Sequence, residues 1–257
     1  MFVRRNTKYI EGGDYLKNPN HIIKEELADI LKARNPKDRL DLRNAEFVSM
    51  DLSGWDLSNC DFSDASFIDM TMDGVNLDNC IMQSAWFSGK NSLRGAKMTN
   101  SSLREVGFRY VDLTNADISG SDIYCSILEK AVLDGIVHDE KTEWFEMKCP
   151  PEGTAFIAWK CCIDLRVVQL LIPKDAKRVM ATLETGRVNR AKVLSIKSVD
   201  ETESYDWAQS TVDQDFFYYT GKYVEPSNGF QEDRWMDSSQ GLHFFLEREQ
   251  CIKYATV

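Results

Sequence analysis

The stretch that decides the fold is NCDFSDASFIDMTMDGVNLDNC, residues 59–80, which begins and ends with the same two residues. Asn59-Cys60 returns as Asn79-Cys80 after twenty residues, a spacing that neither a helix nor a single strand produces. Around this stretch an apolar residue occupies every fifth position, with one extra residue before Leu93. These central residues are Leu42, Phe47, Leu52, Leu57, Phe62, Phe67, Met72, Leu77, Met82, Phe87, Leu93, Met98, Leu103, Phe108, Leu113, Ile118, Ile123, Leu128 and Leu133.

Each five-residue unit has the composition of a short extended segment followed by a corner. Two positions before most central residues stands a second small or apolar side chain, as at Cys60, Ala65 and Cys80. Side chains two residues apart lie on the same face of an extended segment, so both are expected to point inward. The other three positions are mostly Asp, Asn, Ser, Gly and Thr, which favour exposed turns.

Like residues recur at a spacing of twenty, which predicts that four units make one coil. Phe47, Phe67 and Phe87 fall in one such column, and Cys60 and Cys80 fall in another. Stacked coils would lie about 4.8 Å apart, the spacing between hydrogen-bonded strands. This spacing would put the two cysteines within the Cα range of a disulfide, about 4.4–6.8 Å, although we favour two free thiols in a column of small residues.

These units carry a resemblance to a known family. Ala116-Asp117-Ile118-Ser119-Gly120 and Cys60-Asp61-Phe62-Ser63-Asp64 resemble the units of the pentapeptide-repeat proteins, and the resemblance covers residues 40–136 with nineteen units. It implies a mainly β fold, a right-handed quadrilateral β-helix of about five coils.

Some positions depart from the family pattern. Leu40, Met50, Trp55 and Met70 are bulky where the family prefers small residues, so we expect an irregular or open first coil. Asn91 is a polar residue at an inward position beside the extra residue, which predicts a bulge or a small loop there.

The segment before the repeats, residues 1–39, is predicted to end in a capping helix. Apolar residues have helical spacing from Asn20 to Leu31, with Asn20 as the expected N-cap and Asn35-Pro36 as the stop. An open end of a β-helix exposes unpaired strand edges that need a cover. We therefore expect the helix to turn Leu27, Ile30 and Leu31 towards the first coil.

The five-residue pattern stops near Ile136, and residues 137–257 are expected to form a smaller α+β domain with mostly antiparallel strands. Strand-like segments cover 154–160, 165–172, 190–197, 216–224 and 242–246, and a helix is predicted over 247–255. Segments such as 157–160 and 241–245 make this part similar to a domain of unknown function that follows pentapeptide repeats. That family usually has cysteines where this chain reads 184–187 and 237–240, so we expect no thiol or metal role there.

Composition narrows the class of protein. The chain has 257 residues and a net charge of −10, which argues against nonspecific binding of nucleic acid or of anionic membranes. No apolar run approaches the roughly 20 residues needed to span a bilayer, and the start lacks the apolar core of a signal peptide. Seven cysteines without ligand spacing indicate free thiols in a reducing compartment. The sequence predicts a cytoplasmic protein.

Acidic residues are concentrated in the first half of the repeats. Residues 40–87 contain nine acidic residues and a single basic residue, a net charge of −8. Some pentapeptide-repeat proteins mimic B-form DNA and occupy the DNA site of gyrase-type topoisomerases, so the resemblance implies a protein partner of this kind. The partner-facing candidates are Asp41, Glu46, Asp51, Asp56, Asp61, Asp64 and Asp69. The alternative is that Asp before a central residue hydrogen-bonds to the turn backbone.

Trp86 stands at an outward position where the pattern expects Asp or Asn. An exposed tryptophan can anchor an interface, either with another protein or in a homodimer. The alternative is that it packs under the C-terminal domain or the local bulge.

The sequence contains no catalytic, cofactor-binding or metal-binding motif, so we predict a non-enzymatic interaction protein. The rival hypothesis is a ligand-binding or catalytic C-terminal domain carried on an inert rod. In this hypothesis Asp175, Arg178 and His243 form a ligand pocket. The alternative for His243 is a packed core, which is typical of a histidine beside two phenylalanines.

Overall fold

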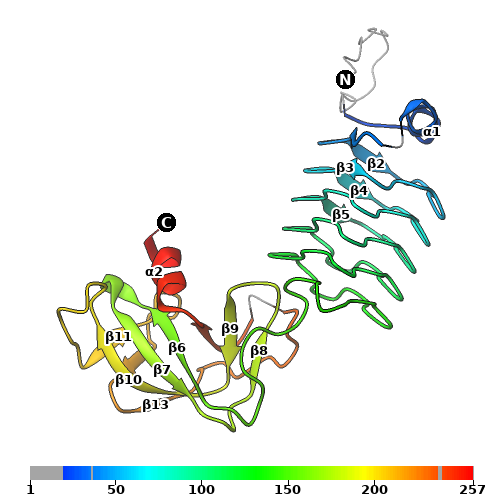
Figure 1. Ribbon diagram of the computed structural model, residues 1–257. Helices are drawn as coiled ribbons and strands as arrows, with labels where there is room; N and C mark the ends of the chain where they lie inside the picture. The colour runs from blue at the N-terminus through cyan, green and yellow to red at the C-terminus, as the bar shows by residue number, and fades with distance from the viewer. Residues whose placement is uncertain (1–19, 36, 237–238, 257) are drawn as a thin grey trace.

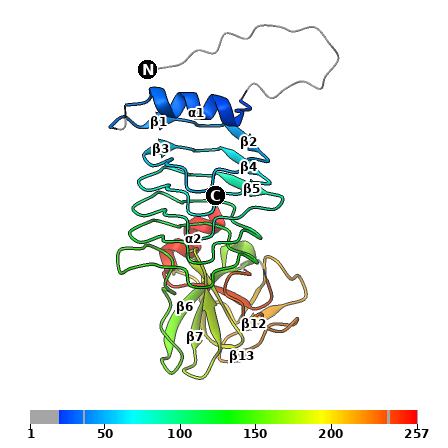
Figure 2. The same cartoon turned by 90° about the vertical axis from the view of Figure 1, so that its right-hand side faces the viewer.

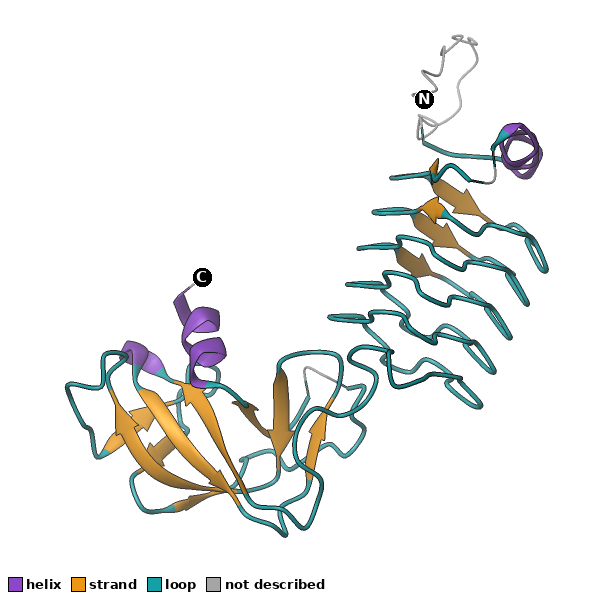
Figure 3. Ribbon diagram, viewed as in Figure 1, coloured by secondary structure: helices purple, strands orange, loops and turns teal. Residues whose placement is uncertain are grey.

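The computed structural model describes residues 20–35, 37–236 and 239–256 (Figure 1). The fold is mainly β. A stack of coils forms the first part, and a separate antiparallel sheet follows it in the chain. Most of each coil consists of turns and single bridges, so only short strands appear along the stack (Figure 3).

Parallel bridges join the coils in four separate ladders. One contains β1 (Leu40–Asp41) and β3 (Cys60–Asp61), and another contains β2 (Glu46–Val48), β4 (Ser66–Ile68) and β5 (Trp86–Ser88). The bridged residues are Asp41, Asp61, Ile81, Ser102 and Asp122; Glu46, Ser66, Trp86, Gly107 and Ile127; Asp51, Thr71, Ser92, Asp112 and Val132; and Asp56, Asn76, Lys97, Asp117 and Val137.

The central residues fill the inside of the stack. Phe47, Phe67, Phe87 and Phe108 form a continuous stack of rings, with centroids 5.1, 4.7 and 5.3 Å apart and planes within 20° of parallel. The predicted column of residues twenty apart is therefore confirmed for these rings. Cys60 and Cys80 are buried free thiols, as expected.

The extra residue before Leu93 shifts the ladders from a spacing of twenty to twenty-one, as in the bridge between Thr71 and Ser92. Asn91 is buried there, and its side chain forms hydrogen bonds with two backbone groups next to the shift. Its Oδ1 accepts from the Met70 amide at 2.9 Å, and its Nδ2 donates to the Ser88 carbonyl at 2.8 Å. A polar residue can occupy this inward position because both its ends are bonded.

The first coil is more regular than expected. β1 pairs with β3 in unbroken register, and Asp51 and Asp56 continue the twenty-residue spacing. Met50 and Met70 are buried in the common core, and Trp55 packs partly buried against it. The expectation of an irregular first coil is wrong because the core accommodates these bulky side chains.

Helix α1 (Lys24–Ala33) lies across the end of the stack (Figure 2). Leu27 is fully buried and Leu31 packs beside it against the coil core. Asn20 is not the N-cap, because that position is held by Ile23 without a side-chain bond. Instead, the Asn20 carbonyl accepts from the Glu46 amide at 2.9 Å, so the residues before the helix pair with the first coil.

The C-terminal part is built on a seven-stranded sheet of order β13-β10-β7-β6-β14-β9-β8, with only antiparallel pairs. Its strands are β6 (Phe156–Cys161), β7 (Val167–Ile172), β8 (Arg178–Met180), β9 (Thr185–Val188), β10 (Ala191–Lys197), β13 (Tyr223–Val224) and β14 (Leu242–Phe245). A hairpin of β11 (Trp207–Gln209) and β12 (Phe217–Tyr219), a 3-10 turn at Ile163–Leu165 and helix α2 (Arg248–Thr256) complete it. The predicted segment 216–224 is thus two strands, and sequence analysis missed β8, β9 and β11.

The sheet has a core on each face. Cys251 of α2 packs with Cys161, Val167 and Phe245 on one side, and a larger core that includes Ala158 and Tyr218 covers the other. None of the helices within the described ranges has the length and apolar character needed to cross a membrane.

The sheet is joined to the last coil by specific contacts. The Thr182 hydroxyl donates to the Ser126 carbonyl at 2.8 Å, and the Cys125 amide donates to the Thr182 carbonyl at 3.0 Å. The rings of Phe145 and Trp235 meet with centroids 5.5 Å apart.

Candidate functional site

The acidic candidates are distributed over all four ladders of the first coils. Asp41 and Asp61 are neighbours in one ladder, while Glu46, Asp51 and Asp56 begin the other three. Because each ladder residue points away from the core, their charges surround the stack instead of gathering on one face.

Most of these carboxylates also hold the turns. One oxygen of Asp41, Asp51, Asp56 and Asp61 accepts from the amide two residues later, at 3.2, 2.9, 3.1 and 3.0 Å. Asp112, Asp117 and Asp122 repeat the same bond in later coils. The structure therefore contains the turn chemistry that was the alternative to partner binding. The turn bond uses one oxygen, so each carboxylate keeps its negative charge and has a second oxygen for other contacts.

Basic residues offset part of this charge. Arg43 contacts Asp41 at 2.9 Å and Asp61 at 3.9 Å, and Arg34 contacts Asp56 at 3.5 Å.

The corner residues Asp64 and Asp69 lie outside these ion pairs. Both adopt positive φ, at 58° and 53°. The Asp69 carboxylate accepts from the Lys90 amide at 2.8 Å, whereas the exposed Asp64 carboxylate bonds to no residue in the described part of the chain.

The turn bonds predict how the stability of the coils depends on pH. Hydrogen bonding to Ser53 lowers the pKa of Asp51, and hydrogen bonding to Ser58 lowers that of Asp56. A carboxylate with a lowered folded-state pKa contributes stability above the ordinary Asp value, about 3.9, and loses it as pH falls through the folded-state value. We expect the free energy of unfolding to fall on acidification below about pH 4.

Thermal unfolding followed by circular dichroism over this pH range would test the expectation. Asn76 accepts the same turn bond from the Asp78 amide at 3.0 Å, so Asp51→Asn should keep the turn while losing the titration. As the pH is lowered below about 4, the thermal unfolding midpoint of the double variant Asp51→Asn/Asp56→Asn should fall less steeply than that of the wild type. Asp64→Asn is the control. The prediction would be contradicted if the unfolding midpoint depended on pH in the same way in the wild type, the double variant and the control.

Trp86 lies on the outside of the stack and is 42% exposed. A Cβ added to Gly107 would lie 2.1 Å from its ring, so the indole covers the glycine of the next coil. Trp86 therefore packs along the wall of the stack, with almost half of its surface left for contacts.

The structure does not bring Asp175, Arg178 and His243 together, and the predicted three-residue pocket is wrong in this respect. Arg178 is 3% exposed, and its guanidinium donates to backbone carbonyls in the segments 150–154 and 173–176. Asp175 pairs with Arg190 at 2.7 Å. His243 lines a cavity that neither Asp175 nor Arg178 borders.

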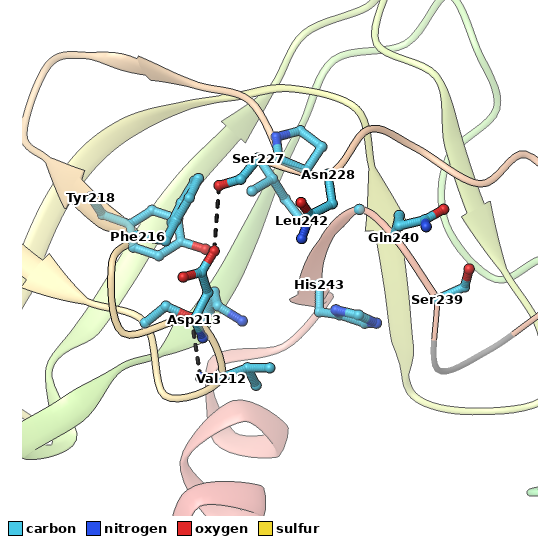
Figure 4. Close-up of a pocket in the computed structure, with 14 residues that line it drawn as sticks. Val212, Asp213, Phe216, Tyr218, Ser227, Asn228, Ser239, Gln240, Leu242 and His243 are labelled. Carbon is cyan, nitrogen blue, oxygen red and sulfur yellow. Dashed lines mark hydrogen bonds between the residues drawn. The ribbon is translucent and has the colours of Figure 1, made fainter.

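That cavity, of about 360 Å³, lies between the sheet and the loops that cover it (Figure 4). Lys160, Asp213, Tyr218, Leu242 and His243 are among the residues that line it. Burial lowers the pKa of Lys160 and raises that of Tyr218 well above its ordinary value. The sequence analysis did not identify Lys160 or Tyr218 as candidate site residues, although Lys160 is the last residue of the segment 157–160 named there. No cluster of His, Cys, Asp and Glu that could hold a metal occurs within the described residues.

Comparison with known proteins finds a family match for each of two parts of the chain. Residues 40–118 match the family profile described as a pentapeptide repeat region. The chain contains a pentapeptide-repeat region. The pentapeptide-repeat family is one of non-catalytic scaffolds. Residues 145–251 match a family of unknown function (DUF5758). No curated protein matches the chain significantly.

Several solved structures are similar to the chain, and some of them are described as pentapeptide-repeat proteins. One, from the thylakoid lumen of Arabidopsis thaliana, is 15% identical over 47% of this chain and 79% of its own, with a TM-score of 0.34. HetL, from the cyanobacterium Nostoc, is 18% identical over 40% of this chain and 50% of its own, with a TM-score of 0.22. QnrB1, a plasmid-mediated fluoroquinolone resistance protein, is 18% identical over 43% and 70%, with a TM-score of 0.23.

Proposed function

We propose that this protein is a non-enzymatic interaction protein whose acidic first coils bind the basic cleft of a DNA-handling enzyme in place of DNA. In this proposal residues 40–136 form a right-handed, four-sided β-helix of about five coils. Residues 1–39 supply helix α1 as its cap, and residues 137–257 form the α+β domain. The enzyme is a topoisomerase, a nuclease or a restriction-type complex.

The observation that carries the proposal is the charge of residues 40–87, with nine acidic residues against Arg43. The bridges give these acids outward positions in every ladder, so a cleft that wraps the stack would meet negative charge from each side. Charge of one sign on a narrow body accelerates association with a surface of the opposite sign.

The length and charge of the stack limit how closely the coils can imitate duplex DNA. Nineteen units make about 4.75 coils, so at about 4.8 Å per coil the rod is roughly 23 Å long, and duplex DNA presents about 13 charges over that length. The coils offer a net charge of −8, part of which Arg34 offsets by pairing with Asp56. The proposal therefore implies a competitor that fills only part of a DNA-binding cleft and is sensitive to salt.

Two matched triple variants would test it. Asp51→Asn, Asp56→Asn and Asp61→Asn remove three charges from the acidic coils, while Asp112→Asn, Asp117→Asn and Asp122→Asn remove three from coils in which acids and bases balance. All six positions hold the same turn bond, and Asn76 indicates that asparagine keeps it. Both variants should therefore fold alike.

The measurement is displacement of labelled duplex DNA from a type II topoisomerase and from a restriction endonuclease. We expect the wild type to displace DNA from at least one of them, with an affinity that falls about tenfold or more between 50 and 200 mM salt. The early-coil variant should lose about tenfold in affinity, and the later-coil variant should lose much less. Displacement that resists salt, or equal losses in the two variants, would rule the proposal out.

A further inference from the structure

A partly buried lysine, Lys160, lines the cavity of the C-terminal domain. Lys160 is on β6, in the middle of the seven-stranded sheet, between β7 and β14. Side chains alternate along a strand, so Lys160 is on the same face as Ala158, which is fully buried in the larger core. An amine on this face is removed from water except through the cavity that it lines.

The Lys160 amine and the Tyr218 hydroxyl have no hydrogen-bond or ion-pair partner among the residues that the structure describes. Burial is the main cause of the lowered pKa of Lys160, and the ionisable groups that act against this shift are the thiols of Cys161, Cys162 and Cys251. Tyr218 is 1% exposed and lines the same cavity. Leaving an ammonium group desolvated and unpaired costs free energy that a bound anion would offset.

We propose that this cavity binds a small organic carboxylic acid, whose carboxylate accepts hydrogen bonds from the Lys160 ammonium and the Tyr218 hydroxyl. One ammonium and one neutral donor match the single charge of a carboxylate, whereas a phosphate dianion would remain half neutralised. Phe216, Pro226 and Leu242 provide apolar walls for the rest of the molecule. A volume of about 360 Å³ is at the lower end of the range for small-molecule sites.

Another polar residue that lines the cavity, Asp213, also restricts which ligand can bind. Asp213 is held at the wall, where its Oδ2 accepts from the Ser227 hydroxyl at 3.4 Å (Figure 4). Its charge helps to raise the pKa of Tyr218, and it forms no ion pair with Lys160 in the part of the chain that the structure describes. A second negative charge near Asp213 would be repelled, which favours a ligand with a single acidic group whose charge the Lys160 ammonium neutralises.

The test uses the full chain and the thermal unfolding midpoint of its C-terminal domain. The probes are acetate, benzoate and phenylacetate, with benzamide as the uncharged analogue and inorganic phosphate as a second anion. We expect at least one carboxylate to raise Tm by about 2–4 °C near saturation, while benzamide has no effect. Lys160→Met should raise Tm without ligand, because it removes a desolvated charge, and should abolish the shift.

Two further variants complete the design. Tyr218→Phe keeps the ring and should reduce the shift, whereas Lys222→Met changes an exposed lysine outside the cavity and should retain it. The proposal is overturned if no carboxylate in the panel stabilises the wild type, or if Lys160→Met responds as the wild type does. A shift with phosphate alone would also overturn it. This outcome is independent of whether the coils bind a DNA-handling enzyme.

Discussion

Replacing Arg178 by alanine should lower the free energy of unfolding of the C-terminal domain by about 3–5 kcal/mol. The guanidinium is the centre of a buried network of backbone carbonyls. It donates to Thr154 at 2.6 Å, to Pro173 at 2.7 Å and to Ala176 at 2.9 Å, with longer contacts to neighbouring carbonyls. Alanine would leave these carbonyls without a donor in a place that water does not reach.

Lysine should not rescue this position. An ammonium group has three donors on a single atom, whereas the planar guanidinium reaches two segments of the chain at once. Urea unfolding, combined with hydrogen exchange of the β6 and β8 amides, would measure the loss in this domain. Arg190→Ala is the control, because Arg190 forms an ion pair with Asp175 near the surface and should cost less than about 1 kcal/mol. Equal costs for Arg178→Ala and Arg190→Ala would refute the prediction.

The ladders could be predicted from the sequence because the information that specifies them is local and repeated. Every coil restates the same five-residue pattern, so the column of Phe47, Phe67 and Phe87 follows from counting alone. Asn91 could be recognised as an exception for the same reason. Asn20 was misassigned because its neighbours pair with the first coil through their backbones, and a hydrogen bond of this kind leaves no mark on residue type.

The residues of the second domain could not be placed in this way. Arg178 reads as one of a basic cluster with Lys174 and Lys177, yet β8 turns it inward while Lys177 pairs with Glu232 at the surface. The cavity collects Lys160 and Tyr218 from strands far apart in the sequence. Neither local pattern nor charge predicts which of several lysines will face such a space, since that depends on how the sheet is ordered.

Replacing Phe67 by alanine should cost about 3–5 kcal/mol, because it removes the middle of a stack of rings. Phe67 is fully buried, with its centroid 5.1 Å from Phe47, 4.7 Å from Phe87 and 5.6 Å from Phe62. The coils are joined by backbone bonds in fixed register, so they cannot close the space by sliding past one another. We therefore expect a persistent cavity.

The matched control is Trp86→Ala, in the neighbouring strand of the same ladder, where the lost side chain is 42% exposed. It should cost about 1 kcal/mol, a typical value for a partly exposed position. In a solenoid each coil contacts only its neighbours, so Phe67→Ala should reduce hydrogen-exchange protection of residues 40–87 more than that of 108–128. It should leave the urea transition of the C-terminal domain almost unchanged, since distant sites contribute additively. If Phe67→Ala cost no more than Trp86→Ala, the ring stack would not be what holds these coils together.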